Sequence, residues 1–313
     1  MKIAIIGAGA VGCWYAALLT RAGHDVCLQA RGATLAALRA GPLRVRSALL
    51  GDVDVAVRAV ADPSEAGPVD IVLLAVKSQG VVSTLPSLPG WLGADTPVIT
   101  LQNGVDAPAQ VAAHLGPDHP VWPGCVYLLA SALTPGEVVQ SAGPDRLVFG
   151  DPSGRATERT EALAQLLRAA GVDAVATPTI LASLWEKFGM IAGWNGVLSV
   201  ARQPIGVVFA DPVMLAFLRA VIDESHAVGR ARGIPLAANL TDKQLAFMAG
   251  FAPGAYGSMV TDLFAGRPLE LEALNGAVVR LGREVGVPTP HNLAIYAALR
   301  PYVNGAAPKA PTV

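Results

Sequence analysis

A glycine-rich run near the N-terminus has the residue types and spacing of a phosphate-binding loop. Residues 7–12 read G-A-G-A-V-G and match the pattern G-x-G-x-x-G between a short apolar stretch and a helical pattern. The first glycine permits a tight turn, the second lets the backbone approach a pyrophosphate, and the third lets the helix pack on the strand. A helix N-terminus also offers free N–H groups to phosphates. We therefore predict that a dinucleotide binds at Gly7, Ala8, Gly9, Ala10, Val11 and Gly12.

The end of the second expected strand predicts which dinucleotide binds. An NAD enzyme usually has an acidic residue there to bind the ribose 2′-hydroxyl, but this chain has Gln29, Ala30 and Arg31. Arg31 can form a bidentate pair with a 2′-phosphate, and Lys77 follows a buried strand that ends at Val76. The sequence favours NADP over NAD, the alternative being that Arg31 is an ordinary solvated residue.

Lys187 is a candidate proton donor. Hydride addition to a ketone puts negative charge on the carbonyl oxygen, so a cation or proton donor must lie within hydrogen-bond reach. A lysine ammonium supplies both properties, and Asn195, eight residues later, lies on roughly the same helix face. Because a lone helical lysine more often extends its charge into solvent, the assignment depends on the surrounding pattern.

That pattern resembles the ketopantoate reductases (2-dehydropantoate 2-reductases) over nearly the whole chain. The resemblance begins with the glycine loop and Arg31. It continues in segments 75–77 (Ala-Val-Lys), 101–104 (Leu-Gln-Asn-Gly), 185–187 (Trp-Glu-Lys), 257–262, 266–276 and 286–290. The C-terminal segments are far more specific than the glycine loop.

The resemblance implies NADPH-dependent reduction of a 2-oxo acid to a 2-hydroxy acid, with ketopantoate reduced to pantoate. It assigns catalytic roles to Lys187 and Glu270. It implies substrate contacts for Asn103, Asn195 and Ser258, and it places Asn103 and Lys77 near the cofactor. By itself, Glu270 would be an ordinary carboxylate at a helix N-terminus.

Position 191 departs from the family pattern. The family has asparagine four residues after its lysine, whereas this chain has Ile191. Isoleucine removes a hydrogen-bonding group and makes the pocket more apolar. A site that binds a substrate hydroxyl can discriminate by ~10⁴–10⁵ against an analogue that lacks it, whereas an apolar pocket discriminates weakly. The sequence therefore predicts a reductase but leaves the identity of its 2-oxo acid open.

Two other functions remain as alternatives. One is an NADPH-dependent dehydrogenase of another small keto or imino acid. The other is a catalytically silent protein that senses NADPH. The segment from Ser258 to Glu270 argues against the first, and retention of Lys187, Ser258 and Glu270 together argues against the second.

The order of patterns predicts an α/β Rossmann-type domain over 1–178 and an all-helical domain over 179–313. Alternating strands and helices indicate a parallel sheet, with short antiparallel strands between 121 and 150. Beyond Pro178 the strand signals end, and 305–313 resembles a frayed tail. The expected strands are 2–6, 25–29, 43–46, 53–59, 69–76, 97–101 and 172–176, and the expected helices are 10–21, 156–170, 181–200, 212–232, 242–250 and 270–285.

Composition excludes several classes of protein. The chain has 313 residues, of which 52% are hydrophobic and 15% charged, so it is not a disordered chain. A net charge of -1 without a basic stripe argues against nucleic-acid binding. Three cysteines have no metal spacing, no apolar run reaches the ~18 residues of a membrane span, and glycines weaken a signal-peptide interpretation of the N-terminus. We expect a cytoplasmic enzyme without metal, acting on a small molecule, and compatible with a homodimer.

Overall fold

The computed structural model describes residues 1–155 and 157–306 and divides into two compact units. The sheet unit comprises Met1–Gln102 and Ala107–Leu181, and the helical unit comprises Asn103–Asp106 and Ala182–Val313. Segment 103–106 therefore groups with the helical unit, although the chain on both sides of it belongs to the sheet unit. Ala156, in an expected helix, and residues 307–313, in the expected tail, lie outside the described residues.

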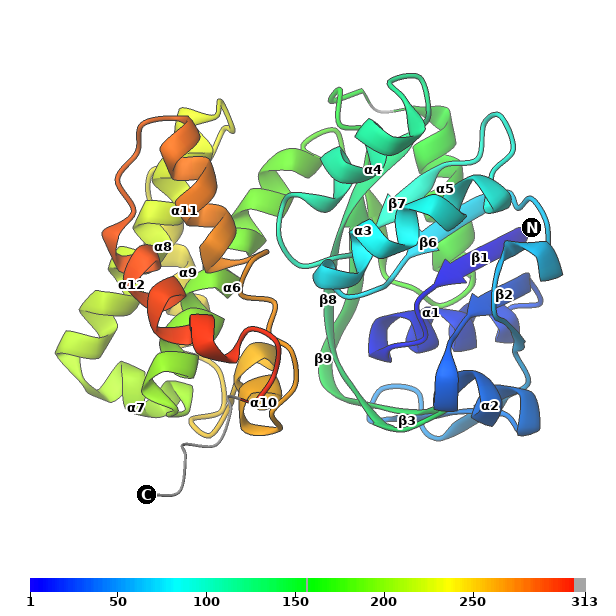
Figure 1. The fold of residues 1–313 in the computed structure, drawn as a ribbon, viewed down its shortest axis with the longest axis horizontal. Helices are drawn as coiled ribbons and strands as arrows, with labels where there is room; N and C mark the ends of the chain where they lie inside the picture. Colours follow the sequence, from blue (N-terminus) through cyan, green and yellow to red (C-terminus); the bar gives the residue numbers. More distant parts are fainter. Residues whose placement is uncertain (156, 307–313) are drawn as a thin grey trace. The chain divides into compact units, whose positions relative to one another are not determined.

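The expected Rossmann-type alternation of strands and helices is confirmed in the sheet unit (Figure 1). Its described strands form one ten-stranded sheet, in which the path β5-β2-β1-β6-β7-β8 is parallel throughout. The strands are β1 (Lys2–Ile6), β2 (Asp25–Gln29), β3 (Leu43–Ser47), β4 (Val53–Val55), β5 (Arg58–Val60), β6 (Ile71–Leu74), β7 (Val98–Thr100), β8 (Val121–Thr134), β9 (Glu137–Phe149) and β10 (Ala174–Ala176). The helices are α1 (Ala10–Arg21), α2 (Gly32–Ala40), α3 (Val81–Thr84), α4 (Ala107–Leu115) and α5 (Glu158–Ala169), with short 3₁₀ turns at Pro63–Glu65, Ser78–Gly80 and Leu85–Trp91.

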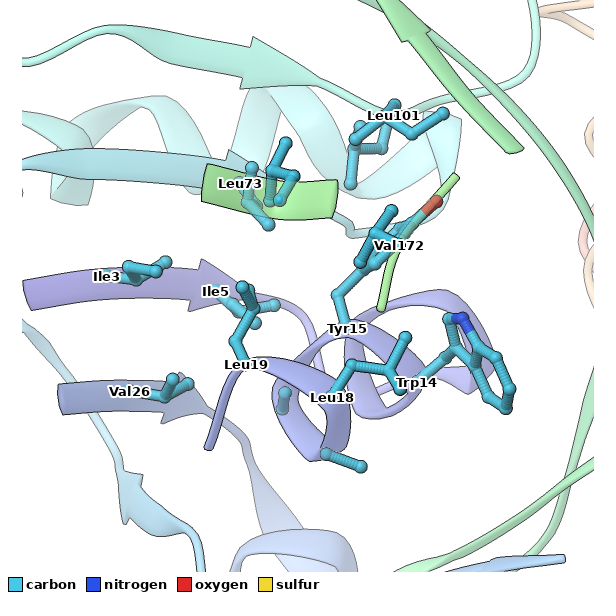
Figure 2. Close-up of a cluster of buried hydrophobic side chains, with 14 of the residues drawn as sticks. Ile3, Ile5, Trp14, Tyr15, Leu18, Leu19, Val26, Leu73, Leu101 and Val172 are labelled. Carbon is cyan, nitrogen blue, oxygen red and sulfur yellow. The ribbon is translucent and has the colours of Figure 1, made fainter. Parts of the chain in front are cut away.

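Both faces of the central sheet are buried, which explains why residues 3–6 of β1 and all four residues of β6 are apolar. On β1, Ile3 and Ile5 belong to a core with α1 and α5, whereas Ala4 and Ile6 belong to a second core with α3 and α4. Successive side chains of a strand point to opposite faces, so the two cores alternate along it. Figure 2 shows the first core, where Leu19 of α1 lies beside Ile5 of β1 and Tyr15 lies beside Val172.

Two expectations for the sheet are wrong. The strand expected over 53–59 is two strands at opposite edges: β4 pairs with β3, and β5 pairs with β2. Between 121 and 150 the chain forms one long antiparallel pair, β8 and β9, in place of the expected short strands, and β9 continues through residues 142–144. Register shifts around Leu129 absorb the irregularity, as β-bulges do. The antiparallel pairing itself is confirmed.

In the described residues beyond Ala176 there is no strand, so the expected helical character of this part is confirmed (Figure 1). One core, which includes Trp185, Phe188 and Ile222, joins the helices. The helices are α6 (Ile180–Ala201), α7 (Ile205–Ala210), α8 (Pro212–Ala231), α9 (Leu240–Met248), α10 (Ser258–Phe264), α11 (Asn275–Glu284) and α12 (Pro290–Leu299), followed by a 3₁₀ turn at Arg300–Tyr302.

The helix expected over 270–285 begins five residues late. Residues 270–274 form turns, and α11 starts at Asn275. Glu270 is therefore in the turn before α11 and not at a helix N-terminus. The sequence patterns also did not identify α2, α3, α4, α7, α10 and α12.

A buried histidine joins three helices of the helical unit. His226 of α8 is 1% exposed, and its Nδ1 lies 3.0 Å from Oγ1 of Thr241 on α9. The Thr241 hydroxyl donates to Asp223 Oδ1 at 2.5 Å, so Nδ1 carries the imidazole proton, and Nε2 faces Gly189 of α6, where a Cβ would lie 2.6 Å from it. Burial lowers the pKa of His226 to about 4; nearby Arg230 lowers it further, and Asp223 opposes the shift.

We expect the free energy of unfolding to decrease as the pH falls from 6.5 to about 4. In this window the unfolded chain binds a proton at His226 and the folded chain does not, so acid favours unfolding. The total loss is ~3 kcal/mol, at ~1.4 kcal/mol per pKa unit. Urea unfolding of wild type and His226→Gln at several pH values measures it. If both proteins lose the same stability over this range, His226 titrates as it does in the unfolded chain.

Candidate active site

The loop between β1 and α1 turns at Gly7. Its φ is +113°, and a Cβ there would lie 2.6 Å from the backbone nitrogen of Val76. A Cβ on Gly12 would overlap the carbonyl oxygen of Gly7, whereas a Cβ on Gly9 would have no atom within 4 Å. The loop is therefore tightly packed at both ends and open in the middle, which is the shape that a pyrophosphate needs. Ala8, Ala10 and Val11 complete the loop and the first turn of α1.

Two exposed cations follow strands of the same sheet. Arg31 comes after β2 and directly precedes α2, and Lys77 comes after β6. Because β2, β1 and β6 are parallel neighbours, Arg31, Gly7 and Lys77 lie along one edge of the sheet. In the described chain no carboxylate follows β2 at positions 29–31. With a guanidinium and no carboxylate after β2, this edge of the sheet suits a dinucleotide that carries a 2′-phosphate better than a dinucleotide with a free 2′-hydroxyl.

In the helical unit the structure brings Lys187, Asn103 and Glu270 together. Lys187 lies two turns into α6 and is partly buried; its Nζ donates to Asn103 Oδ1 at 3.0 Å. Asn103 Nδ2 donates to Glu270 Oε2 at 3.3 Å, and Glu270 is 8% exposed. The ammonium can only donate and the carboxylate only accept, so these partners fix the orientation of the Asn103 amide. An ammonium, an amide and a carboxylate are thus aligned in one hydrogen-bonded series.

Contacts with the following residues hold Asn103 in place. Gly104 has a φ of +96°, and a Cβ there would lie 2.6 Å from Ala273 O, in the turn that carries Glu270. Two residues later, Asp106 accepts from Nη2 of Arg280 in α11, at 2.7 Å to Oδ1 and 2.6 Å to Oδ2. The segment is therefore attached to the helical unit at both ends. Sequence reasoning did not identify Asp106 or Arg280, and no spacing between them could have indicated the pair.

Asn195 and Ser258 form a second group. Asn195 is 4% exposed, and its Oδ1 accepts from the backbone nitrogen of Met259 at 3.0 Å, in the first turn of α10. The preceding residue, Gly257, packs directly on Asn195 and Trp194, where there is no room for a Cβ. Ser258 is the first residue of α10 and is exposed. The Asn195 oxygen thus caps the helix that presents Ser258.

Ile191 lies one turn after Lys187 on α6. Its side chain is partly buried and packs against the core of the helical unit. An asparagine there would lose this apolar contact, so the substitution has a structural consequence in addition to any effect on a ligand.

Among residues 1–155 and 157–306 the structure contains neither a cluster of possible metal ligands nor a helix that could cross a membrane. No group of three histidine, cysteine or acidic side chains is arranged to hold a metal ion there. No helix in this range has both the length and the apolar character needed to span a membrane.

A Rossmann-type domain with an open glycine loop, joined to a helical domain with a lysine–asparagine–glutamate series, defines a class of dinucleotide-dependent oxidoreductases. The family model "Ketopantoate reductase PanE/ApbA" matches residues 3–154, and its C-terminal counterpart matches residues 179–303. The chain belongs to the ketopantoate reductase family.

Individual relatives agree with this assignment. The chain is 32% identical to the 2-dehydropantoate 2-reductase of Mesorhizobium japonicum, over 96% of this chain and 97% of that protein. A crystal structure of a PanE/ApbA family ketopantoate reductase from Ralstonia eutropha superposes with a TM-score of 0.88 at 32% identity, over 96% of this chain and 98% of that one. D-mandelate dehydrogenase with NADH and anilino(oxo)acetate has the same fold, with a TM-score of 0.88 at 22% identity, over 96% of this chain and 98% of that one.

Proposed function

We propose that the protein catalyses the NADPH-dependent reduction of a 2-oxo acid to a 2-hydroxy acid, with ketopantoate reduced to pantoate. The hydrogen-bonded series of Lys187, Asn103 and Glu270 carries this proposal, because it supplies a proton donor with a fixed orientation in a member of this family. We assign cofactor binding to residues 1–178 and substrate binding and catalysis to residues 179–313. The direct test follows NADPH absorbance with purified protein and a panel of 2-oxo acids that includes ketopantoate. Binding of NADPH without oxidation by any of them would favour a silent sensor instead.

Most of the cofactor role falls on residues of the sheet unit, and Asn103 of the helical unit is the exception. We assign the pyrophosphate to the loop 7–12, the 2′-phosphate to Arg31, and further phosphate or ribose contacts to Lys77. Asn103 is assigned to both cofactor and substrate. NADPH would supply the hydride, and the chain supplies binding, orientation and the proton.

Within the helical unit each polar residue has a distinct role in the proposal. The ammonium of Lys187 attracts the carbonyl oxygen of the substrate and donates a proton to it as negative charge develops. Asn103 holds Nζ of Lys187 in place, and Glu270 orients Asn103. Ser258, exposed at the start of α10, and the amide nitrogen of Asn195 are suited to bind the substrate carboxylate or hydroxyl.

Arg31 is expected to determine the choice between NADPH and NADH. We expect wild type to bind NADPH at least tenfold more tightly than NADH, which corresponds to ~1.4 kcal/mol. Arg31→Ala removes the bidentate partner of the 2′-phosphate and should abolish most of this difference. Fluorescence titration with both nucleotides measures it, with Arg21→Ala, an exposed arginine at the end of α1, as control. Equal affinities in wild type would exclude this role of Arg31.

Ile191 bears on which substrate is preferred. Because it replaces a hydrogen-bonding residue by an apolar one, we propose that recognition of the hydroxyl of ketopantoate depends on Ser258 and Asn195. The panel of 2-oxo acids therefore includes the deoxy analogue of ketopantoate. If both are reduced equally well, the substrate is a more apolar 2-oxo acid.

The remaining proposals concern location and assembly. Cys13, Cys27 and Cys125 are buried thiols, which suits the reducing cytoplasm. The helical unit exposes large apolar side chains, among them Val213 and Phe247, and such surfaces often mark protein contacts. We propose a cytoplasmic homodimer, and sedimentation analysis of the purified protein tests the oligomeric state.

A further inference from the structure

A buried glutamine lies behind the glycine loop. Gln102 follows β7 and is 6% exposed; its Nε2 donates to Leu74 O at 2.8 Å and to Val76 O at 2.9 Å. Leu74 is the last residue of β6, and its oxygen also accepts from the backbone nitrogen of Leu101. Val76 lies beyond the end of the strand. The side-chain amide thus extends the hydrogen bonding between β6 and β7 past the point where the strands stop.

The residues that Gln102 holds are the ones that support Gly7. A Cβ on Gly7 would lie 2.6 Å from Val76 N and 2.8 Å from Ala75 C, so the turn rests directly on this backbone. A Cβ on Gly12 would in turn overlap Gly7 O and lie 3.3 Å from Ala75 Cβ. The contacts therefore run from Gln102 through Val76 to Gly7 and the start of α1, all within the sheet unit.

We propose that Gln102 is a positioning residue for the cofactor, acting through the backbone of residues 75–77. Because Val76 lies beyond β6, strand pairing does not fix its carbonyl within the described sheet. Without the amide, the backbone under Gly7 and next to Lys77 can therefore shift. A phosphate-binding loop depends on preset N–H directions, and such a shift weakens binding without a lost contact to the ligand. This inference rests on the proposed NADPH dependence.

The chemistry of the amide indicates which atoms matter. Its Oε1 is buried and has no hydrogen-bond partner within the described residues. The two bonds donated by Nε2 therefore carry the effect. Gln102→Met keeps the length and burial of the side chain and removes the two donated bonds together with Oε1, which has no partner to lose within the described residues. This makes it the informative variant.

The experiment compares NADPH affinity, by fluorescence titration, in wild type, Gln102→Met and the control Gln140→Met. Gln140, in β9, is fully buried and also uses its side chain, accepting from Ser47 Oγ at 2.7 Å. Both variants lose a buried hydrogen bond and some stability. Only Gln102→Met is expected to bind NADPH about tenfold more weakly, or ~1.4 kcal/mol, with Gln140→Met within about twofold of wild type.

A second readout needs no cofactor. Hydrogen exchange of the ligand-free protein should show faster exchange of the Gly80 amide, which bonds Lys77 O at 2.8 Å, in Gln102→Met but not in Gln140→Met. If Gln102→Met does not fold, Gln102→Leu, which is also apolar and has no donor, takes its place in both measurements.

The outcomes separate this inference from the function on which it rests. A folded Gln102 variant with wild-type NADPH affinity and wild-type exchange at Gly80 would overturn the inference alone. A wild-type protein that does not bind NADPH would overturn the proposed function together with it. Equal weakening in the Gln140 variant would show a general stability effect and would also overturn it.

Discussion

Lys187→Ala is expected to reduce kcat by ~10²–10⁴, the usual range for loss of a general acid. The substitution removes the ammonium that lies 3.0 Å from Asn103 Oδ1 and leaves no ammonium in that position to protonate the carbonyl oxygen. NADPH affinity should stay within about twofold of wild type, because the glycine loop and Arg31 belong to the sheet unit. Steady-state kinetics on the best 2-oxo acid and an NADPH titration measure the two effects separately.

Lys243→Ala provides the matched control for this experiment. Lys243 is an exposed lysine of α9 outside the hydrogen-bonded series, so its loss should change kcat by less than about twofold. Lys187→Arg tests whether charge alone is enough, since arginine keeps the charge but does not release its proton. If Lys187→Ala turns over at nearly the wild-type rate, the lysine is structural and the proposed mechanism is wrong.

The glycine loop was predictable from the sequence because its requirements are local. Gly7, Gly9 and Gly12 provide a turn, an open approach and a close contact between helix and strand, and their spacing in the sequence is enough to indicate these roles. The same holds for the helical character beyond Ala176, which periodicity reveals. The backbone of residues 75 and 76, which also crowds Gly7, is distant in the sequence and was not part of the pattern. Reliance on local patterns also explains the wrong prediction for residues 53–59. Their alternation is typical of one strand, and only the pairing of β4 with β3 and of β5 with β2 shows that the segment forms two strands.

The hydrogen-bonded series was predictable only in its members. The resemblance pointed to Lys187, Asn103 and Glu270, but Asn103 and Glu270 are 167 positions apart, and no periodicity relates them. Their bond requires Gly104 to pack on Ala273 and requires turns, not a helix, over 270–274. The use of the Asn195 oxygen to cap α10 was likewise invisible, because the cap depends on a tertiary contact.

Gly9→Ala is expected to weaken NADPH binding with little loss of stability, whereas Gly12→Ala is expected to lower the folding stability. Gly9 has an extended backbone, with φ -82° and ψ -171°, and open space around it, so alanine should change stability by less than ~0.5 kcal/mol. Its methyl group would occupy the approach of the pyrophosphate and weaken NADPH binding by ~10²-fold, or ~2.7 kcal/mol. A methyl group on Gly12 would overlap Gly7 O. Because this oxygen belongs to the backbone and cannot easily move aside, Gly12→Ala should lower the folding stability by ~3 kcal/mol.

Thermal unfolding of the two variants measures the loss of folding stability, and NADPH titration measures the loss of ligand binding. Gly41→Ala is the matched control, because Gly41 is also extended, with φ -163°, and lies after α2 away from the loop. A methyl group on Gly41 would have no atom within 4 Å, so this variant should leave both stability and NADPH affinity unchanged. If Gly9→Ala binds NADPH as tightly as Gly41→Ala, the phosphates do not approach residue 9, and the cofactor must lie elsewhere along the edge of the sheet.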